Sequence, residues 1–138
     1  MQKQLLINGA NSMANTITGT GYIEIEPYNI SKICLIARMI LNEPVAVRIG
    51  GFPDLDTDKL KSACKKQALD DVFECWGFWV NAHVNEKRYI SFKGTRSDQD
   101  FFLSKIAPFI TRGQITWVSE EGLSWSQEFR SGQSRKID

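Results

Sequence analysis

The sequence predicts an α+β fold: one mixed, largely antiparallel sheet of five or six strands, with about three helices covering one face, ending in a β-hairpin. Three observations predict it. Short segments alternate polar and apolar residues, as half-buried strands do. Longer segments between them carry apolar residues at helical spacing, and two aromatic strands flank a tight loop near the C-terminus. The chain has 138 residues, and we expect residues 1–138 to form a single domain.

The N-terminal half contains three segments with the apolar pattern of strands, each followed by Gly, Asn or Pro. They are Gln2–Ile7, Tyr22–Glu26 and Val45–Ile49. A helix is expected from a cap at Asn29 or Ser31 to Leu41, with an apolar face wider than one stripe. The stretch Gly9–Thr20 is rich in turn-forming residues, so we expect a loose connection there.

In the C-terminal half, one long helix is expected over Thr57–Trp76, with acidic residues at its start. The segment Gly77–Val84 fits either the end of this helix or a strand, and Arg88–Phe92 has the alternation of a strand. Another helix is expected after Ser97, where Pro108 must kink or end it.

The end of the chain predicts a hairpin with a four-residue loop. Its two strands are Gln114–Val118 and Leu123–Arg130. The last segment, Ser131–Asp138, is expected to be a loose tail.

The charges nearly balance, with 17 Lys and Arg against 16 Asp and Glu, for a net charge of +1. This balance argues against binding driven by bulk charge, because nucleic-acid binders usually carry a clear basic excess. No segment reaches the roughly 18–20 apolar residues of a membrane helix, and the apolar start is too short for a signal peptide. We therefore expect no membrane partner, a cytoplasmic location and reduced cysteines.

Few residues are candidates for catalysis. His83 is the only histidine, which we interpret as an ordinary surface or half-buried side chain, with a general base as the alternative. Cys34, Cys64 and Cys75 lie on apolar faces without an evident ligand partner, as buried free thiols do. On the expected long helix Cys64 and Cys75 are about three turns apart, too far to form a disulfide. We predict no catalytic residue.

An acidic run at Asp54, Asp56 and Asp58 superficially resembles the start of a calcium loop. The glycine and the bidentate glutamate that such a loop requires are absent. No glycine-rich segment has the context of a phosphate loop. We therefore predict no metal site and no cofactor.

Strand alternation predicts a polar sheet face opposite the helices, and this face is the candidate binding surface. Two tyrosines and several cations are expected on it. The binding residues that we single out there are Tyr22, Arg48, Lys87, Tyr89, Lys93 and Arg130. Trp79 is a second candidate, because three large aromatics at Trp76, Phe78 and Trp79 cannot all point one way. That cluster fits either core packing or an exposed contact, including a homodimer contact.

Three hypotheses for function follow. The first is a non-enzymatic protein that binds a protein partner, such as an inhibitor, antidote or immunity protein encoded by a bacterium or phage, because Tyr and Arg are enriched at protein interfaces. The second is a module that binds nucleic acid or a nucleotide by stacking and charge on the same face. The third is a small enzyme with an unrecognised site. A plain solvated face remains the alternative to a binding surface.

Overall fold

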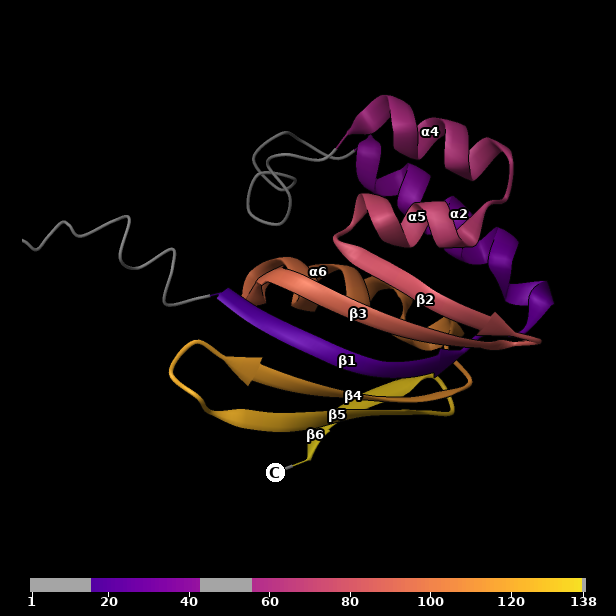
Figure 1. The fold of residues 1–138 in the computed structure, drawn as a ribbon. Helices are drawn as coiled ribbons and strands as arrows, with labels where there is room; N and C mark the ends of the chain where they lie inside the picture. The colour runs from indigo at the N-terminus through magenta and orange to yellow at the C-terminus, as the bar shows by residue number, and fades with distance from the viewer. Residues whose placement is uncertain (1–15, 43–55, 138) are drawn as a thin grey trace, which may run out of the picture.

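A computed structural model describes residues 16–42 and 56–137 of the chain. Within these ranges it contains four helices, a short 3₁₀ turn and one six-stranded sheet (Figure 1). In chain order the elements are β1 (Thr16–Glu24), α2 (Pro27–Leu41), α4 (Thr57–Lys65), α5 (Leu69–Cys75), β2 (Phe78–Val84), β3 (Lys87–Thr95), α6 (Arg96–Ile106), η1 (Ala107–Phe109), β4 (Arg112–Ser119), β5 (Ser124–Arg130) and β6 (Gln133–Ile137). The strand order is β2-β3-β1-β4-β5-β6, and every neighbouring pair is antiparallel. The predicted α+β class is confirmed.

The helices lie on one side of the sheet, with α6 behind β3 and α5 beside β2 (Figure 1). Strand alternation produces this arrangement. In β4, buried Ile115 and Trp117 alternate with exposed Gln114, Thr116 and Val118. The apolar face of each such strand is stabilised by burial away from water, so the helices pack on that face. The apolar core therefore lies between the sheet and the helix layer.

Aromatic rings fill the contact between α5, α6 and β2. Trp76 stacks on Phe102 with 5.0 Å between ring centres, and Phe73 meets Phe102 edge-on at 5.4 Å. Such ring pairs contribute beyond their buried area. The cluster that the sequence left undecided is therefore divided: Trp76 and Phe78 belong to the core, whereas Trp79 is 52% exposed.

Strand β1 is a central strand of the sheet, paired with β3 on one side and β4 on the other. The expectation of a loose connection over Gly9–Thr20 is wrong from Thr16 onward. Threonine is β-branched and suits a strand, but the two glycines that flank Thr20 are typical of turns. Local sequence could not show that these glycines serve close packing instead.

The glycines of β1 leave room for β4. A Cβ added at Gly19 would collide with the indole ring of Trp117. A Cβ added at Gly21 would collide with the carbonyl oxygen of Gln114 and would lie 2.7 Å from the Cα of Ile115. Strand β1 therefore packs against the indole ring of Trp117 at Gly19 and against the backbone of β4 at Gly21.

The long helix expected over Thr57–Trp76 is broken into α4 and α5, so that prediction is wrong. The break occurs at Gln67, whose φ of 57° lies in the left-handed region. Its side-chain amide donates to the carbonyl oxygen of Cys64 at 2.9 Å, satisfying an acceptor at the end of α4. Cys64 and Cys75 therefore lie on different helices, and the expected three-turn separation does not apply.

The expected loose tail instead forms strand β6, which pairs with β5. Ser131 and Gly132 both have positive φ, at 53° and 81°, and join the two strands. Two-residue turns of this kind match the twist of a hairpin. The tail prediction is therefore wrong for Gln133–Ile137.

The remaining strand predictions have mixed outcomes. The hairpin of β4 and β5 is confirmed, and Ser119 N–H donates to the carbonyl oxygen of Leu123 across its loop at 2.8 Å. The segment over 77–84 is mostly strand, with a register shift between Val80 and Ala82. The expected strands at 2–7 and 45–49 lie outside the described residues.

The helix ends differ slightly from expectation. Helix α2 begins at Pro27 rather than after Asn29 or Ser31, because proline suits the first helical turn, where no N–H is needed. Helix α6 begins at Arg96, before the expected cap at Ser97. It ends before Pro108, as expected, and the chain continues as the 3₁₀ turn η1.

We expect Gly21→Ala to lower the free energy of unfolding by at least about 2 kcal/mol, because overpacking against backbone cannot be relieved by a rotamer change. Urea unfolding followed by circular dichroism measures the change. Gly122→Asn is the control: nothing lies within 4 Å of an added Cβ there, and Asn tolerates the positive φ. Equal effects of the two substitutions would contradict the close packing of β1 on β4.

Candidate functional site

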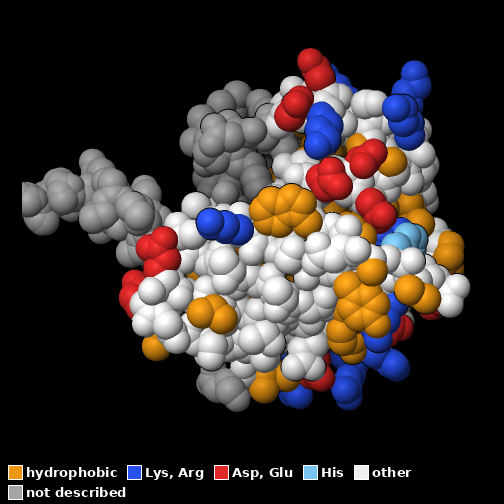
Figure 2. Space-filling model, in the orientation of Figure 1, with side chains coloured by type: hydrophobic (Ala, Val, Ile, Leu, Met, Phe, Trp, Pro, Cys, Tyr) orange, Lys and Arg blue, Asp and Glu red, His pale blue; other side chains and the backbone are white. Residues whose placement is uncertain are grey.

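The sheet face opposite the helices, here called the open face, is covered by none of the described elements (Figure 2). Its side chains follow from the strand pairing and the alternation of each strand. They are Trp79, Asn81, Ala82 and Val84 of β2, Lys87, Tyr89, Ser91 and Lys93 of β3, Thr18, Thr20, Tyr22 and Glu24 of β1, Arg112, Gln114, Thr116 and Val118 of β4, Ser124, Ser126, Glu128 and Arg130 of β5, and Gln133, Arg135 and Ile137 of β6. Figure 2 shows mostly uncharged polar surface in the middle, with Lys and Arg side chains toward the lower right.

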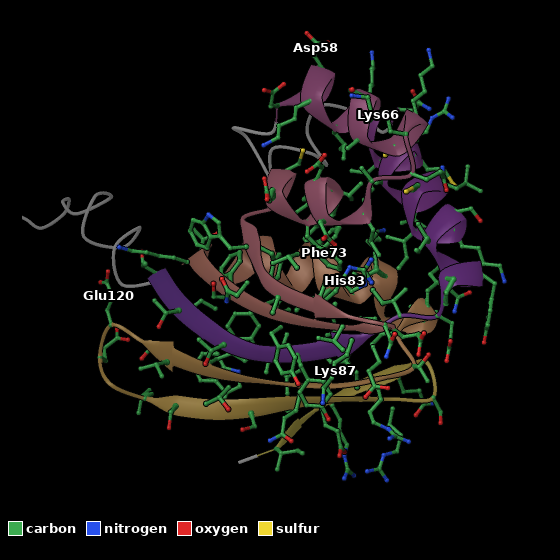
Figure 3. The ribbon with its side chains drawn as sticks, turned by 45° about the vertical axis from the view of Figure 1, so that its right-hand side comes forward. Asp58, Lys66, Phe73, His83, Lys87 and Glu120 are labelled. Atoms are coloured by element: carbon green, nitrogen blue, oxygen red, sulfur yellow. The ribbon has the colours of Figure 1, made fainter. Side chains whose placement is uncertain are left out.

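An aromatic pair with a cation lies where β1 ends and β3 begins. Tyr22 and Tyr89 are cross-strand partners with 6.4 Å between their ring centres. The ammonium group of Lys87, labelled in Figure 3, lies 4.3 Å from the centre of the Tyr22 ring and 5.3 Å from that of Tyr89. The negative faces of the rings attract this cation. Three residues singled out from the sequence therefore form one cluster.

The middle of the open face is uncharged and carries short hydroxyl side chains. Thr20 lies between Ser91 and Thr116 in the strand pairing. The hydroxyls of Thr116 and Ser126 are 3.5 Å apart. Trp79 is the pairing partner of Ser91 and borders this area on the β2 side. The exposed indole, expected as a separate site, therefore belongs to the same face.

Charged side chains gather at the end of the open face where β4 begins and β5 ends. Glu24 lies opposite Arg112 in the pairing of β1 with β4. Glu128 accepts from Arg130 at 3.3 Å and from Arg135 at 3.1 Å. The side chains around Glu128 line a hollow of about 310 Å³ between β5 and β6. Both signs of charge are thus present at this end.

The other predicted binding residues are spread along the sheet. Arg130 lies at the charged end, and Lys93 lies toward the opposite end of β3. Arg48 lies outside the described residues. Sequence reasoning missed Arg112, just before its expected strand, and Arg135, in the expected tail. No local pattern over 133–137 could have placed Arg135 on a strand, because the first four of these five residues are all polar.

His83 takes part in a polar contact on the helix side of the sheet, labelled in Figure 3. Its Nε2 donates to the carbonyl oxygen of Asn85 at 2.6 Å, and its Nδ1 lies 3.9 Å from a carboxylate oxygen of Asp70. Asp70 also accepts a 2.6 Å hydrogen bond from Arg88, which is only 4% exposed. Arg88 thereby ties β3 to α5, and His83 borders this structural ion pair.

The three cysteines are free thiols in the helix layer. Cys34 of α2 and Cys64 of α4 are within hydrogen-bond reach of each other, a proximity that the sequence did not make evident. Burial raises the pKa of Cys64 to about 11 and also raises the pKa values of Cys34 and Cys75. A raised pKa leaves little thiolate near neutrality, so these groups are poor nucleophiles.

The acidic run before α4 has a structural role in its described part. Asp56 caps α4 by accepting from the backbone N–H of Lys59 at 3.0 Å. In residues 16–42 and 56–137, no three His, Cys, Asp or Glu side chains are grouped to hold a metal ion. Within the same ranges, no helix is long and apolar enough to cross a membrane.

We expect Asp70→Ala to lower the free energy of unfolding by about 2 kcal/mol, because it leaves the Arg88 guanidinium buried without its counter-ion. Arg88→Met should cost less, since it removes the buried charge and leaves a half-solvated carboxylate. Thermal unfolding of the two variants measures the difference. A larger loss for Arg88→Met than for Asp70→Ala would show that the ion pair is not what holds α5.

We expect iodoacetamide at pH 8 to leave Cys64 of the folded protein unmodified and to modify all three cysteines after unfolding. Labelling of Cys64 should rise as pH approaches its raised pKa of about 11. In the unfolded chain the pKa of a cysteine thiol is about 8.5. Above that pH the unfolded state loses a proton that Cys64 of the folded protein retains, so the free energy of unfolding falls as the pH rises toward about 11. Peptide mass spectrometry measures the labelling. Fast labelling of folded Cys64 at pH 8 would contradict its burial.

Comparisons with known proteins assign no family to the chain. No protein-family model matches it. Searches of curated proteins and of solved structures give no match either. A function must therefore be inferred from the chemistry of the chain's own side chains.

Proposed function

We propose that the protein acts by binding a protein partner through the open face. The observation that supports this most is the arrangement of that face: exposed aromatics border an uncharged hydroxyl-bearing middle, and charges of both signs lie at one end. Tyr and Trp supply large contact areas at low conformational cost, and Ser and Thr supply adaptable hydrogen bonds. Protein interfaces commonly combine these residue types in this way.

The charges favour a protein over a phosphate backbone. Glu128 neutralises part of the positive charge of Arg130 and Arg135, and Glu24 lies beside Lys87 and Arg112 in the strand pairing. A polyanion approaching this end would meet both carboxylates. A protein with its own mixed charges could pair with both signs.

The small size of the chain fits proteins that act by covering their target, such as inhibitors, antidotes and immunity proteins of bacteria or phages. A cytoplasmic site of action is part of the proposal, because three free thiols suit a reducing compartment. We propose no catalytic role.

A second candidate is binding of single-stranded nucleic acid. The observation that favours it is the pair of half-buried Tyr22 and exposed Tyr89 with the Lys87 ammonium near both rings. Bases stack on aromatic rings, and cations neutralise phosphates. Such binding should weaken steeply with added salt. Binding to a mixed-charge protein should depend on salt less strongly.

We expect Thr116→Arg to abolish capture of the native partner, because it places a long cation in the uncharged middle of the open face. Tyr89→Ala should weaken the interaction by about 2 kcal/mol if this ring is a central contact. Tagged full-length protein, incubated with a lysate of its native host, captures the partner for mass spectrometry.

Ser31→Arg provides the matched control, since Ser31 is an exposed hydroxyl residue on α2. The proposal requires one protein that the wild type and Ser31→Arg capture and that Thr116→Arg does not. Equal capture by both variants would contradict it. Salt-sensitive binding of a labelled single-stranded oligonucleotide that Tyr89→Ala abolishes would favour the second candidate.

A further inference from the structure

A second surface feature lies in the helix layer, away from the open face. It is a hollow of about 420 Å³ between the C-terminal turns of α2 and α4. The described residues that line it are Arg38, Leu41, Asn42, Lys61 and Lys65. Arg38 and Leu41 are one turn apart on α2, and the two lysines are one turn apart on α4, so each helix presents one face to the hollow.

Among the described residues, the cations of this hollow have no counter-ion. Within residues 16–42 and 56–137, none of Arg38, Lys61 and Lys65 forms an ion pair. Of the nearby carboxylates, Asp56 caps α4 and Glu74 pairs with Lys59. Within the described residues, neither Asp58 of α4 nor Asp71 of α5 forms an ion pair with these cations. Like charges that line one hollow repel one another, and an anion between them relieves the repulsion.

The helix dipoles account for only part of this cluster. Arg38 lies in the last turn of α2 and Lys65 in the last turn of α4, where cations stabilise helix ends. Lys61 lies one turn earlier on α4, and the dipole effect falls off within the last turn. Arg38 also lies near Cys64: burial raises the pKa of this thiol, and the charge of Arg38 opposes that rise. The hollow is therefore electropositive beyond what helix capping requires.

We infer that the hollow between α2 and α4 binds a phosphate-bearing small molecule, with Arg38, Lys61 and Lys65 around the phosphate. A phosphate carries nearly two negative charges and several acceptor oxygens, which suits three cations better than the single charge of a carboxylate does. The guanidinium donates paired hydrogen bonds to such oxygens, and the lysines act as point charges.

The size of the hollow leaves room for more than one phosphate group, because small-molecule sites commonly measure about 300–1,000 Å³. Leu41 offers an apolar contact to the rest of such a ligand, and the amide of Asn42 offers both a donor and an acceptor. The site is separate from the open face, so a test of phosphate binding here is independent of whether a protein partner binds the open face.

Isothermal titration calorimetry of the full chain with pyrophosphate, adenosine triphosphate and acetate, at matched ionic strength, tests the inference. We expect both phosphate compounds to bind and acetate not to bind. Tighter binding of the nucleotide would show that the base or sugar also contacts the hollow, and equal binding would assign the site to phosphate alone. No heat and no shift of amide resonances with either phosphate compound at millimolar concentration would overturn the inference.

Substitutions locate the site. Lys61→Gln and Lys65→Gln should each weaken pyrophosphate binding about three- to fivefold, the range expected for one exposed charge contact. Together with Arg38→Gln they should abolish it. Lys66→Gln is the control, because Lys66, labelled in Figure 3, follows α4 directly but does not line the hollow. Thermal unfolding confirms that each variant is folded. Equal weakening by Lys66→Gln and Lys61→Gln would assign the binding to general surface charge and overturn the inference.

Discussion

Strands β1 and β4 approach each other so closely that Gly21 and Gly113 have no room for a side chain. The rest of the sheet depends on this contact, because β1 joins β3 and β2 on one side to β4, β5 and β6 on the other. Trp117 lies over Gly19 from the same strand pair and becomes part of the core. A side chain at these positions would separate the two halves of the sheet, or force a different register.

The packing on one side of the sheet leaves the other side to solvent. Because Ile115 and Trp117 face the helices, their neighbours in β4 face outward. Residues that pair across neighbouring strands point to the same side, so the whole six-stranded sheet has one face toward the helices and one face outward. The Tyr22–Tyr89 pair, the hydroxyl middle and the ion pairs of Glu128 therefore belong to one continuous surface. This surface combines aromatic, hydroxyl and oppositely charged side chains, and on this basis we propose a binding function for it.

The helix layer is held by a different kind of contact. Arg88 points into this layer from β3 and binds Asp70 of α5, so a buried charge fixes where α5 sits. The break at Gln67 separates α4 from α5, so that α4 can pack beside α2. This arrangement brings Cys34 close to Cys64 and places Arg38, Lys61 and Lys65 around one hollow. The open face thus lies on the sheet, and the hollow between α2 and α4 lies in the helix layer.

The sequence by itself determined the α+β class, the antiparallel character of the sheet and the division of most strands into buried and exposed faces, because alternation and helical spacing are local patterns. It also placed Tyr22, Lys87 and Tyr89 on one face. Only the tertiary structure decided that the Gly- and Thr-rich segment is the central strand, that the chain turns back at Ser131 and Gly132 to add β6, and that the cations of α2 and α4 meet. Those features arise from contacts between residues far apart in the chain, and local propensity carries no information about such contacts.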